Sequence, residues 1–135
     1  MLKFFNETAI ITYQPDTSII LVTFGDSENY DDYLETIQIA EGMAQVHGSV
    51  SYLIEKKDFN KLPIDRYGQF STHWMGHLDA QSNARQSVAW LVPAFAFSPL
   101  SDYYHRQEVS ASYPLVAYNV FTSPEAGIQF LRATE

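Results

Sequence analysis

The first part of the chain alternates polar and apolar positions in the manner of a β-hairpin. Residues 8–13 are rich in β-branched and aromatic side chains. Turn residues follow at 14–17, where Pro15 presets φ and Asp16 can bond its own backbone. Residues 18–24 form a second strand that is apolar on both faces, which favours a central position in a sheet. The pattern therefore predicts a hairpin at the start of the domain.

The period then changes to that of an α-helix over residues 30–44, where apolar side chains recur at three- and four-residue steps. Ser27 or Asn29 can accept a hydrogen bond from the first turn. Gly48 follows where a helix needs a left-handed residue to end. These signals predict one amphipathic helix between the hairpin and the next strand.

The rest of the chain alternates strands with helices. We predict a short buried strand over residues 50–54, a helix entered at Pro63 and continued to Leu78, a strand over 87–92, a helix opening at 98–100, a strand over 115–121, and a helix capped by Ser123 that continues through 126–131. Residues 55–58 are interpreted as a polar break, and residues 82–86 as a frayed helix end or loop.

The order of elements is therefore β-β-α-β-α-β-α-β-α. Alternating strands and helices imply right-handed crossovers and a largely parallel sheet, with the first strand added antiparallel. The sequence shows no internal repeat, linker or low-complexity tract. We expect one α/β domain over residues 1–135, with a mixed, mostly parallel five-stranded sheet, an N-terminal hairpin and about four helices.

Composition and charge exclude several classes of protein. The 135 residues are 46% hydrophobic, which is enough for one core, and contain no cysteine for disulfides, thiolate metal sites or a thiol nucleophile. A net charge of −8, with Lys56 and Lys57 as the largest run of cations, disfavours nucleic acid and anionic membranes. No apolar run has the length of a signal peptide or of a membrane span, so we expect a cytoplasmic protein without stable membrane insertion.

Four segments resemble the small standalone bacterial proteins of the STAS-like superfamily. They are the hairpin over residues 9–24, the helix ending at Gly48, the strand with a charged tail over 52–59, and the closing strand, turn and helix over 118–131. That group shares its fold with anti-sigma-factor antagonists and is compared with CRAL-TRIO lipid-transfer domains. The resemblance implies a STAS-like fold and, more weakly, a non-enzymatic binding or regulatory role.

Regulatory members of that superfamily carry a phosphorylatable Ser or Thr at the start of the helix after the third strand. Here the corresponding residues 58–65 contain neither, and Asp65 stands at the approximate position with a permanent negative charge. An acidic side chain there also stabilises the positive end of the helix dipole, which is the simpler interpretation. The phosphorylation switch is therefore not expected in this chain.

One pattern has the spacing of a metal site. His73 and His77 stand four residues apart on a predicted helix, so both can face one side and chelate zinc. The residue after the first histidine is Trp74, where a metalloprotease has glutamate, and only nearby Asp79 suggests a third ligand. Gly76 also argues against a rigid helix at this point. Two partly exposed structural histidines are the simpler interpretation, and we expect no cofactor.

Signatures of catalysis are missing from the sequence. There is no Gly-x-Ser-x-Gly elbow, no Gly-x-Gly-x-x-Gly and no Gly-Lys-Ser/Thr loop. Nothing in the sequence connects a serine to a histidine and a carboxylate. A metal-dependent hydrolase built on the two histidines is the remaining enzymatic hypothesis, and we expect a protein that is not an enzyme.

Large apolar side chains gather in the second half of the chain. The candidates for a ligand pocket or an interface are Tyr67, Phe70, Trp74, Met75, Phe95 and Phe97. Core packing is the alternative for all of them, and we expect it for Trp90 in its strand. Phe95 and Phe97 follow Pro93 at the carboxyl end of a strand, where open α/β sheets bind ligands.

Two functional hypotheses follow. The first is a binding or regulatory module that acts through protein contacts, as a homodimer or with a regulatory protein partner. It is motivated by strands that are apolar on both faces, since the second face of the sheet needs cover from the hairpin, a helix or another subunit. The second is a carrier or sensor of a small apolar ligand such as a lipid.

Overall fold

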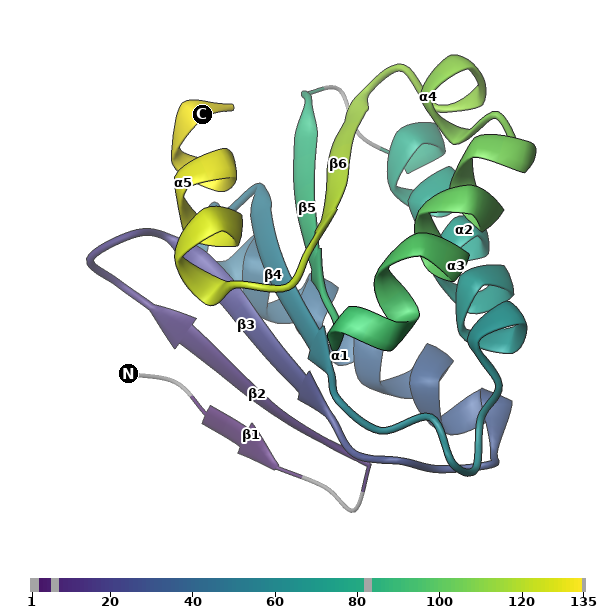
Figure 1. The fold of residues 1–135 in the computed structure, drawn as a ribbon. Coiled ribbons are helices and arrows are strands. Elements are labelled where there is room, and N and C mark those ends of the chain that lie inside the picture. Colours follow the sequence, from purple (N-terminus) through teal and green to yellow (C-terminus); the bar gives the residue numbers. More distant parts are fainter. Residues whose placement is uncertain (1–2, 6–7, 82–83, 135) are drawn as a thin grey trace.

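The protein alternates strands and helices around one sheet, as Figure 1 shows for a computed structural model that describes residues 3–5, 8–81 and 84–134. The strands are β1 (Lys3–Phe5), β2 (Ala9–Gln14), β3 (Ile19–Phe24), β4 (Ser51–Lys56), β5 (Gln86–Leu91) and β6 (Val116–Phe121). The helices are α1 (Tyr30–His47), α2 (Ile64–Gln81), α3 (Ala94–Arg106), α4 (Val109–Ser112) and α5 (Pro124–Ala133).

The strands lie in the sheet in their order along the chain, β1-β2-β3-β4-β5-β6. The pairs β1–β2 and β2–β3 are antiparallel, and every pair from β3 to β6 is parallel. This confirms the predicted α/β class, the hairpin and the mostly parallel sheet. The short strand β1 and the one-turn helix α4 are additions that the periodicity did not reveal, because three or four residues are too few to show a period.

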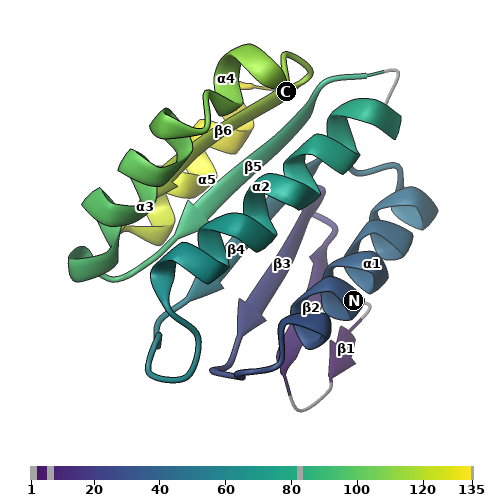
Figure 2. The same cartoon turned by 90° about the vertical axis from the view of Figure 1, so that its right-hand side faces the viewer.

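The helices divide unequally between the two faces of the sheet. Parallel strands in sequential order with right-handed crossovers must place all their connecting helices on one side. Figure 2 shows α1, α2 and α3 lying together across that side of the sheet. After β6 the chain turns the other way, and α5 packs against β4, β5 and β6 on the opposite face.

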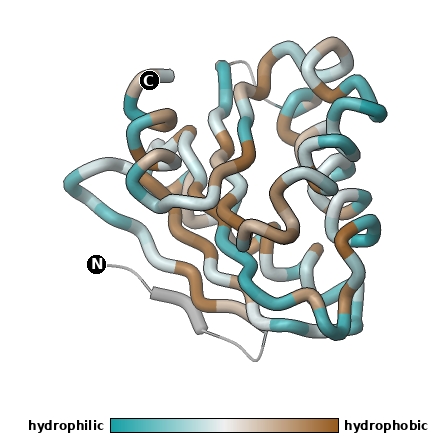
Figure 3. Tube along the Cα trace, in the orientation of Figure 1, coloured by the Kyte–Doolittle hydropathy of each residue, from teal (hydrophilic) through white to brown (hydrophobic). Residues whose placement is uncertain are grey.

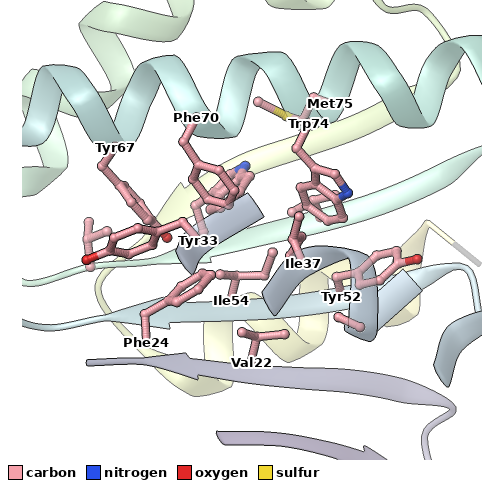
Figure 4. Close-up of a cluster of buried hydrophobic side chains, with 14 of the residues drawn as sticks. Val22, Phe24, Tyr33, Ile37, Tyr52, Ile54, Tyr67, Phe70, Trp74 and Met75 are labelled. Carbon is pink, nitrogen blue, oxygen red and sulfur yellow. The ribbon is translucent and has the colours of Figure 1, made fainter. Parts of the chain in front are cut away.

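The larger core lies between the sheet and α1 to α3. Figure 4 shows Tyr67, Phe70 and Trp74 pointing from α2 toward the strands, where they meet Phe24 and Ile54. Trp90 on β5 is also fully buried, as predicted, and its ring lies edge-on to Trp74 at 5.8 Å between centroids. Such aromatic pairs add about 0.5–1.5 kcal/mol each beyond the area that they bury. Figure 3 shows the hydrophobic stretches of the strands at the centre of the fold.

A smaller core lies under α5. Ile19, Leu53, Ala89, Leu91 and Leu131 form it. Because β3 and β5 contribute to both cores, their expected two-sided apolar character is confirmed. Gly127 brings α5 close to the sheet: a Cβ there would lie 3.0 Å from the Leu53 side chain.

Three boundaries differ from those predicted. Strand β4 continues to Lys56, through half of the expected polar break. Helix α2 continues through Gly76, as expected, and ends at Gln81, three residues beyond Leu78; a Cβ at Gly76 would stand 2.9 Å from the Tyr113 ring. Helix α3 begins at Ala94, four residues before the expected start, and includes Pro99 in its second turn. In β4 and α3 tertiary packing outweighs a local polar or proline signal.

Local capping signals were more reliable. Asn29 caps α1 by accepting a hydrogen bond from the Asp31 backbone N–H, and Ser123 caps α5 by accepting one from Ala126. Gly48 ends α1 in the left-handed conformation with φ of 65°. The expected loop at residues 82–86 falls partly outside the described residues, at positions 82 and 83.

Alanine substitution at two glycines of this region should have opposite effects on stability. Gly48→Ala should lower the free energy of unfolding by about 1–2 kcal/mol, because a Cβ is strained at positive φ although open space surrounds it. Gly42→Ala, inside the exposed part of α1 and also in open space, should raise it by about 0.5–1 kcal/mol. Urea unfolding of both variants measures the difference, and equal signs would contradict this assignment.

Candidate functional site

The carboxyl ends of the parallel strands meet at one edge of the sheet. The loops after β3, β4, β5 and β6 all lie there, and this edge is where open α/β sheets place their ligands. Three features gather at it: a buried lysine, an aromatic surface and a small pocket.

The buried lysine is Lys56, the last residue of β4, whose side chain is inaccessible to solvent. Its ammonium donates to the Gly25 carbonyl and to the Tyr33 hydroxyl, both at 3.0 Å. The third partner is the Asp26 carboxylate at 3.4 Å. Because an ammonium has three protons, these contacts satisfy it completely, and Lys56 joins the ends of β3 and β4 to α1.

Asp26 extends this network to the loop that leads into α2. One carboxylate oxygen accepts a hydrogen bond from the Lys61 backbone N–H at 2.7 Å, and the other accepts one from Leu62 at 3.3 Å. The Asp26 side chain therefore fastens the β4–α2 loop to the end of β3. A charged acceptor makes these bonds stronger than neutral ones.

The pKa values of the three groups follow from burial and charge. Desolvation lowers the pKa of Lys56, and the neighbouring Asp26 only partly opposes it. Burial acts to raise the pKa of Asp26, but the Lys61 and Leu62 hydrogen bonds and the Lys56 charge together hold it below its usual value. Burial, with the nearby carboxylates, raises the pKa of Tyr33 to about 12 despite its hydrogen bond with Ser27. Asp26 is therefore ionised near neutral pH.

An aromatic surface lies directly over the lysine. The Lys56 ammonium stands 5.1 Å from the centre of the Phe59 ring, within cation–π range. Phe59 in turn meets Phe95, edge to face, with 6.1 Å between ring centroids. Phe95 is 63% exposed, the most exposed aromatic side chain among the large apolar residues on the described surface. We call Phe59 and Phe95 the aromatic ledge.

A pocket of about 300 Å³ lies beside the ledge, where the chain changes face. Helix α3 leaves β5 toward one face of the sheet and α5 leaves β6 toward the other, which is the switch-point geometry of open α/β sheets. The pocket is lined by Glu55, Lys57, Leu91, Val92, Pro93, Thr122 and Pro124. It carries one acid and one base, so it has no strong preference for the charge of a ligand.

The structure separates the six aromatic and methionine candidates into two groups. Tyr67, Phe70, Trp74 and Met75 are buried in the larger core, where they fill the space between α2 and its neighbours. Phe95 and Phe97 lie on the surface, in the first turn of α3 rather than in a loop. Two residues apart on a helix, they project to different sides, so only Phe95 belongs to the ledge.

The two candidate metal ligands lie on the exposed side of α2. His77 Nε2 is 3.3 Å from a Glu41 carboxylate oxygen on α1. Asp79 points elsewhere, since it accepts a hydrogen bond from the Leu115 backbone at 2.8 Å. Among residues 3–5, 8–81 and 84–134, no three His, Cys, Asp or Glu side chains are grouped closely enough to hold a metal ion.

Lys56 and Asp26 are the site residues that the sequence analysis missed. Lys56 was assigned to an exposed polar break, next to Lys57. A signal was present in the alternation of the strand, because Tyr52, Ile54 and Lys56 are two residues apart and share the face toward the larger core. Extending the strand by one residue pair would have placed the lysine inside.

Comparison with known proteins yields no relative for this chain: no protein-family model, no curated protein and no solved structure matches it. The fold and the site are therefore interpreted from the chain itself. None of the helices in its described part has both the length and the apolar character that crossing a bilayer requires.

The charge of Asp26 should contribute to stability only above acidic pH. Asp26→Asn keeps one acceptor oxygen but loses the charge, so the variant should be less stable by about 2 kcal/mol at pH 7. Since the pKa of Asp26 is lower in the folded chain, this advantage of the wild type is lost as pH falls through that value. Chemical unfolding between pH 7 and pH 2.5 measures the difference.

The control for this prediction is Asp102→Asn, which neutralises an exposed carboxylate on α3. It should change the free energy of unfolding by less than about 0.5 kcal/mol at either pH. A wild-type advantage over Asp26→Asn that persists unchanged at pH 2.5 would contradict the role assigned to the charge.

Proposed function

We propose that this chain is a non-enzymatic binding or regulatory module that contacts another protein through the aromatic ledge. The observation that carries the proposal is Phe95, whose ring is 63% exposed on the first turn of a helix. The partner that fits has an apolar pocket for this ring and a basic rim around it. Aromatic side chains, phenylalanine among them, are enriched at protein interfaces relative to the rest of the surface.

Rigidity of the ledge supports this function. Phe59 lies on a loop whose backbone is held by Asp26, and its ring rests over the Lys56 ammonium. Phe95 rests on Phe59 from a helix packed against α2. A surface that is already ordered loses little conformational entropy when it binds. Lys56 and Asp26 are buried at a cost in desolvation, and the fixed loop that they produce lowers the entropic cost of binding if that loop is a contact surface.

Charge supports a basic partner. The chain carries a net charge of −8, which accelerates association with a positively charged surface and opposes association with a second copy. Close to the ledge, Asp65 and Asp102 line a broad hollow between α2 and α3 together with Ser98 and Pro99. His105 and Arg106 bound the hollow at its other end. The partner's basic groups would face the acidic end.

The resemblance to STAS-like proteins supports the same edge. In its regulatory members the start of the helix after the third strand is the phosphorylated contact region, and residues 58–65 correspond to it here. This segment contains Phe59 and the loop held by Asp26, with Asp65 exposed in the first turn of α2. Because Asp65 is permanently charged, we propose a contact that does not depend on phosphorylation.

The homodimer also stays a proposal, with a different surface. Helix α5 covers β4 to β6 on its face of the sheet, and a groove of about 290 Å³ remains between that helix and β2 and β3. Leu21, Leu53 and Ile128 contribute apolar surface to it. A sedimentation mass of 15.4 kDa that does not change with concentration would exclude the dimer and leave the aromatic ledge unaffected.

Replacing Phe95 should weaken partner binding strongly without unfolding the chain. A photoactivatable phenylalanine derivative at position 95 should cross-link the partner in cells, and the partner is then purified for a direct titration. Phe95→Ser should weaken that complex at least tenfold, the loss expected when an interface anchor is removed. The thermal midpoint should stay within about 2 °C, because the side chain is mostly in solvent.

Val46 provides the matched control. It is 77% exposed on α1, on a helix that does not contribute to the ledge, so Val46→Ser removes similar apolar surface elsewhere. This variant should bind the purified partner as the wild type does. The proposal fails if the two variants bind equally well, or if no protein cross-linked at position 95 forms a complex with the purified chain.

A further inference from the structure

A second hollow lies at the opposite edge of the sheet from the aromatic ledge. It has a volume of about 290 Å³ and lies between the carboxyl-terminal halves of α1 and α2, next to the start of β4. Glu41, Gln45, Ser49, Tyr52 and Leu78 are among its lining residues. We call it the amino-edge hollow. Nothing in the proposed protein contact involves it.

Tyr52 contributes a hydroxyl group to the wall of the hollow. The residue is only 2% exposed, and its ring packs edge-on against Trp74 with 5.0 Å between centroids. Within residues 3–5, 8–81 and 84–134 its hydroxyl makes no hydrogen bond, and it is not one of the sealed polar atoms without a partner, so it opens onto the hollow that Tyr52 lines. In Figure 4 the hydroxyl of Tyr52 and the indole nitrogen of Trp74 lie on the same side of the cluster. A hydroxyl at the wall of a hollow can form a hydrogen bond with a ligand or with solvent.

Glu41 gives the hollow its charge. Its side chain is 12% exposed, and one oxygen accepts a hydrogen bond from Trp74 Nε1 at 2.6 Å. The other lies 3.3 Å from His77 Nε2. An ionised carboxylate offers about four acceptor positions, so two remain for a ligand. Burial and the charge of Glu41 both raise the pKa of Tyr52, which keeps its hydroxyl protonated.

We propose that the amino-edge hollow binds a small organic cation that carries a primary ammonium or a guanidinium group. The cation's N–H groups would donate to the Glu41 carboxylate and to the Tyr52 hydroxyl, and the Tyr52 ring would form the aromatic wall of the site. Among the described residues that line the hollow there is no lysine or arginine, so an anion would find a negative potential and no counter-charge. The amides and hydroxyl of Gln45 and Ser49 complete a polar lining that disfavours an apolar ligand.

Size narrows the ligand further. A volume of about 290 Å³ is at the lower end of small-molecule sites, which suits a short aliphatic amine or guanidine. The same group can also come from a lysine side chain of another protein. Both sources present the same N–H donors, so the experiment includes one probe for each.

Titration calorimetry of the full chain tests the site. The probes are putrescine and agmatine as free cations, an N-acetylated lysine amide for the protein-borne source, and 1,4-butanediol as the neutral analogue of putrescine. At least one cation should bind, with a change in Trp74 fluorescence because its indole N–H contacts Glu41, and butanediol should not bind.

Two variants locate the binding. Tyr52→Phe should weaken the cation complex about tenfold and leave the thermal midpoint unchanged or higher, because the lost hydroxyl had no partner in the chain. Glu41→Gln should abolish binding. Tyr30→Phe, at a half-buried tyrosine at the start of α1, and Glu35→Gln, at an exposed position of α1, are the matched controls and should bind as the wild type does. Phe95→Ser should also leave this binding unchanged, which separates the hollow from the aromatic ledge.

The proposal is overturned if no cation binds at millimolar concentration, if butanediol binds as tightly as putrescine, or if Tyr52→Phe and Glu41→Gln bind like their controls. Binding of the lysine amide alone would support the site and assign its ligand to a protein side chain. Binding of putrescine or agmatine would support it and assign a free metabolite.

Discussion

The handedness of the parallel crossovers is the constraint on which the rest of this structure depends. With four parallel strands in sequential order, three right-handed connections must return on the same side of the sheet. That side becomes thick and collects most of the large aromatic residues, among them Tyr67, Trp74 and Trp90. The other side is left to α5, whose approach is limited by the contact of Gly127 with Leu53.

At the carboxyl edge, the same constraint brings the ends of β3 and β4 beside the start of α2. The buried ammonium of Lys56 joins these segments through three hydrogen bonds. Burying Lys56 is unfavourable in isolation, and only complete hydrogen bonding with Gly25, Asp26 and Tyr33 offsets it. As a result, the loop between β4 and α2 has a defined shape; it carries Phe59, whose ring supports Phe95. An uncharged edge could fold as well but would hold this loop less firmly.

The amino edge is built by the opposite means. There, a hollow lies between the carboxyl-terminal halves of α1 and α2, and β4 beside it starts with Ser51 and Tyr52. Side chains do not close the space, and its polar groups are only partly satisfied from within the chain. Glu41 is held in place by Trp74 and His77, so the histidine that suggested a metal site serves instead as a neighbour of the carboxylate. The two edges of the sheet therefore differ. At the carboxyl edge a buried ion pair holds the loops and aromatic rings face the solvent, whereas at the amino edge a hollow stays open and the Glu41 carboxylate lines it.

What the sequence by itself determined are the features with local causes. Gly48, Ser123 and Pro124 mark helix ends because backbone conformation and capping hydrogen bonds involve only neighbouring residues. The strands that are apolar on both faces also predicted a central, largely parallel sheet, because only a strand covered on both faces has this pattern. Only the tertiary structure decided that Lys56 lies inside, that α3 begins at Ala94 and includes Pro99, and that Tyr67 and Phe70 fill a core while Phe95 meets solvent. Those outcomes depend on which distant side chain arrives to pair with a charge, fill a gap or leave a ring uncovered, and such contacts are set by packing across the whole fold.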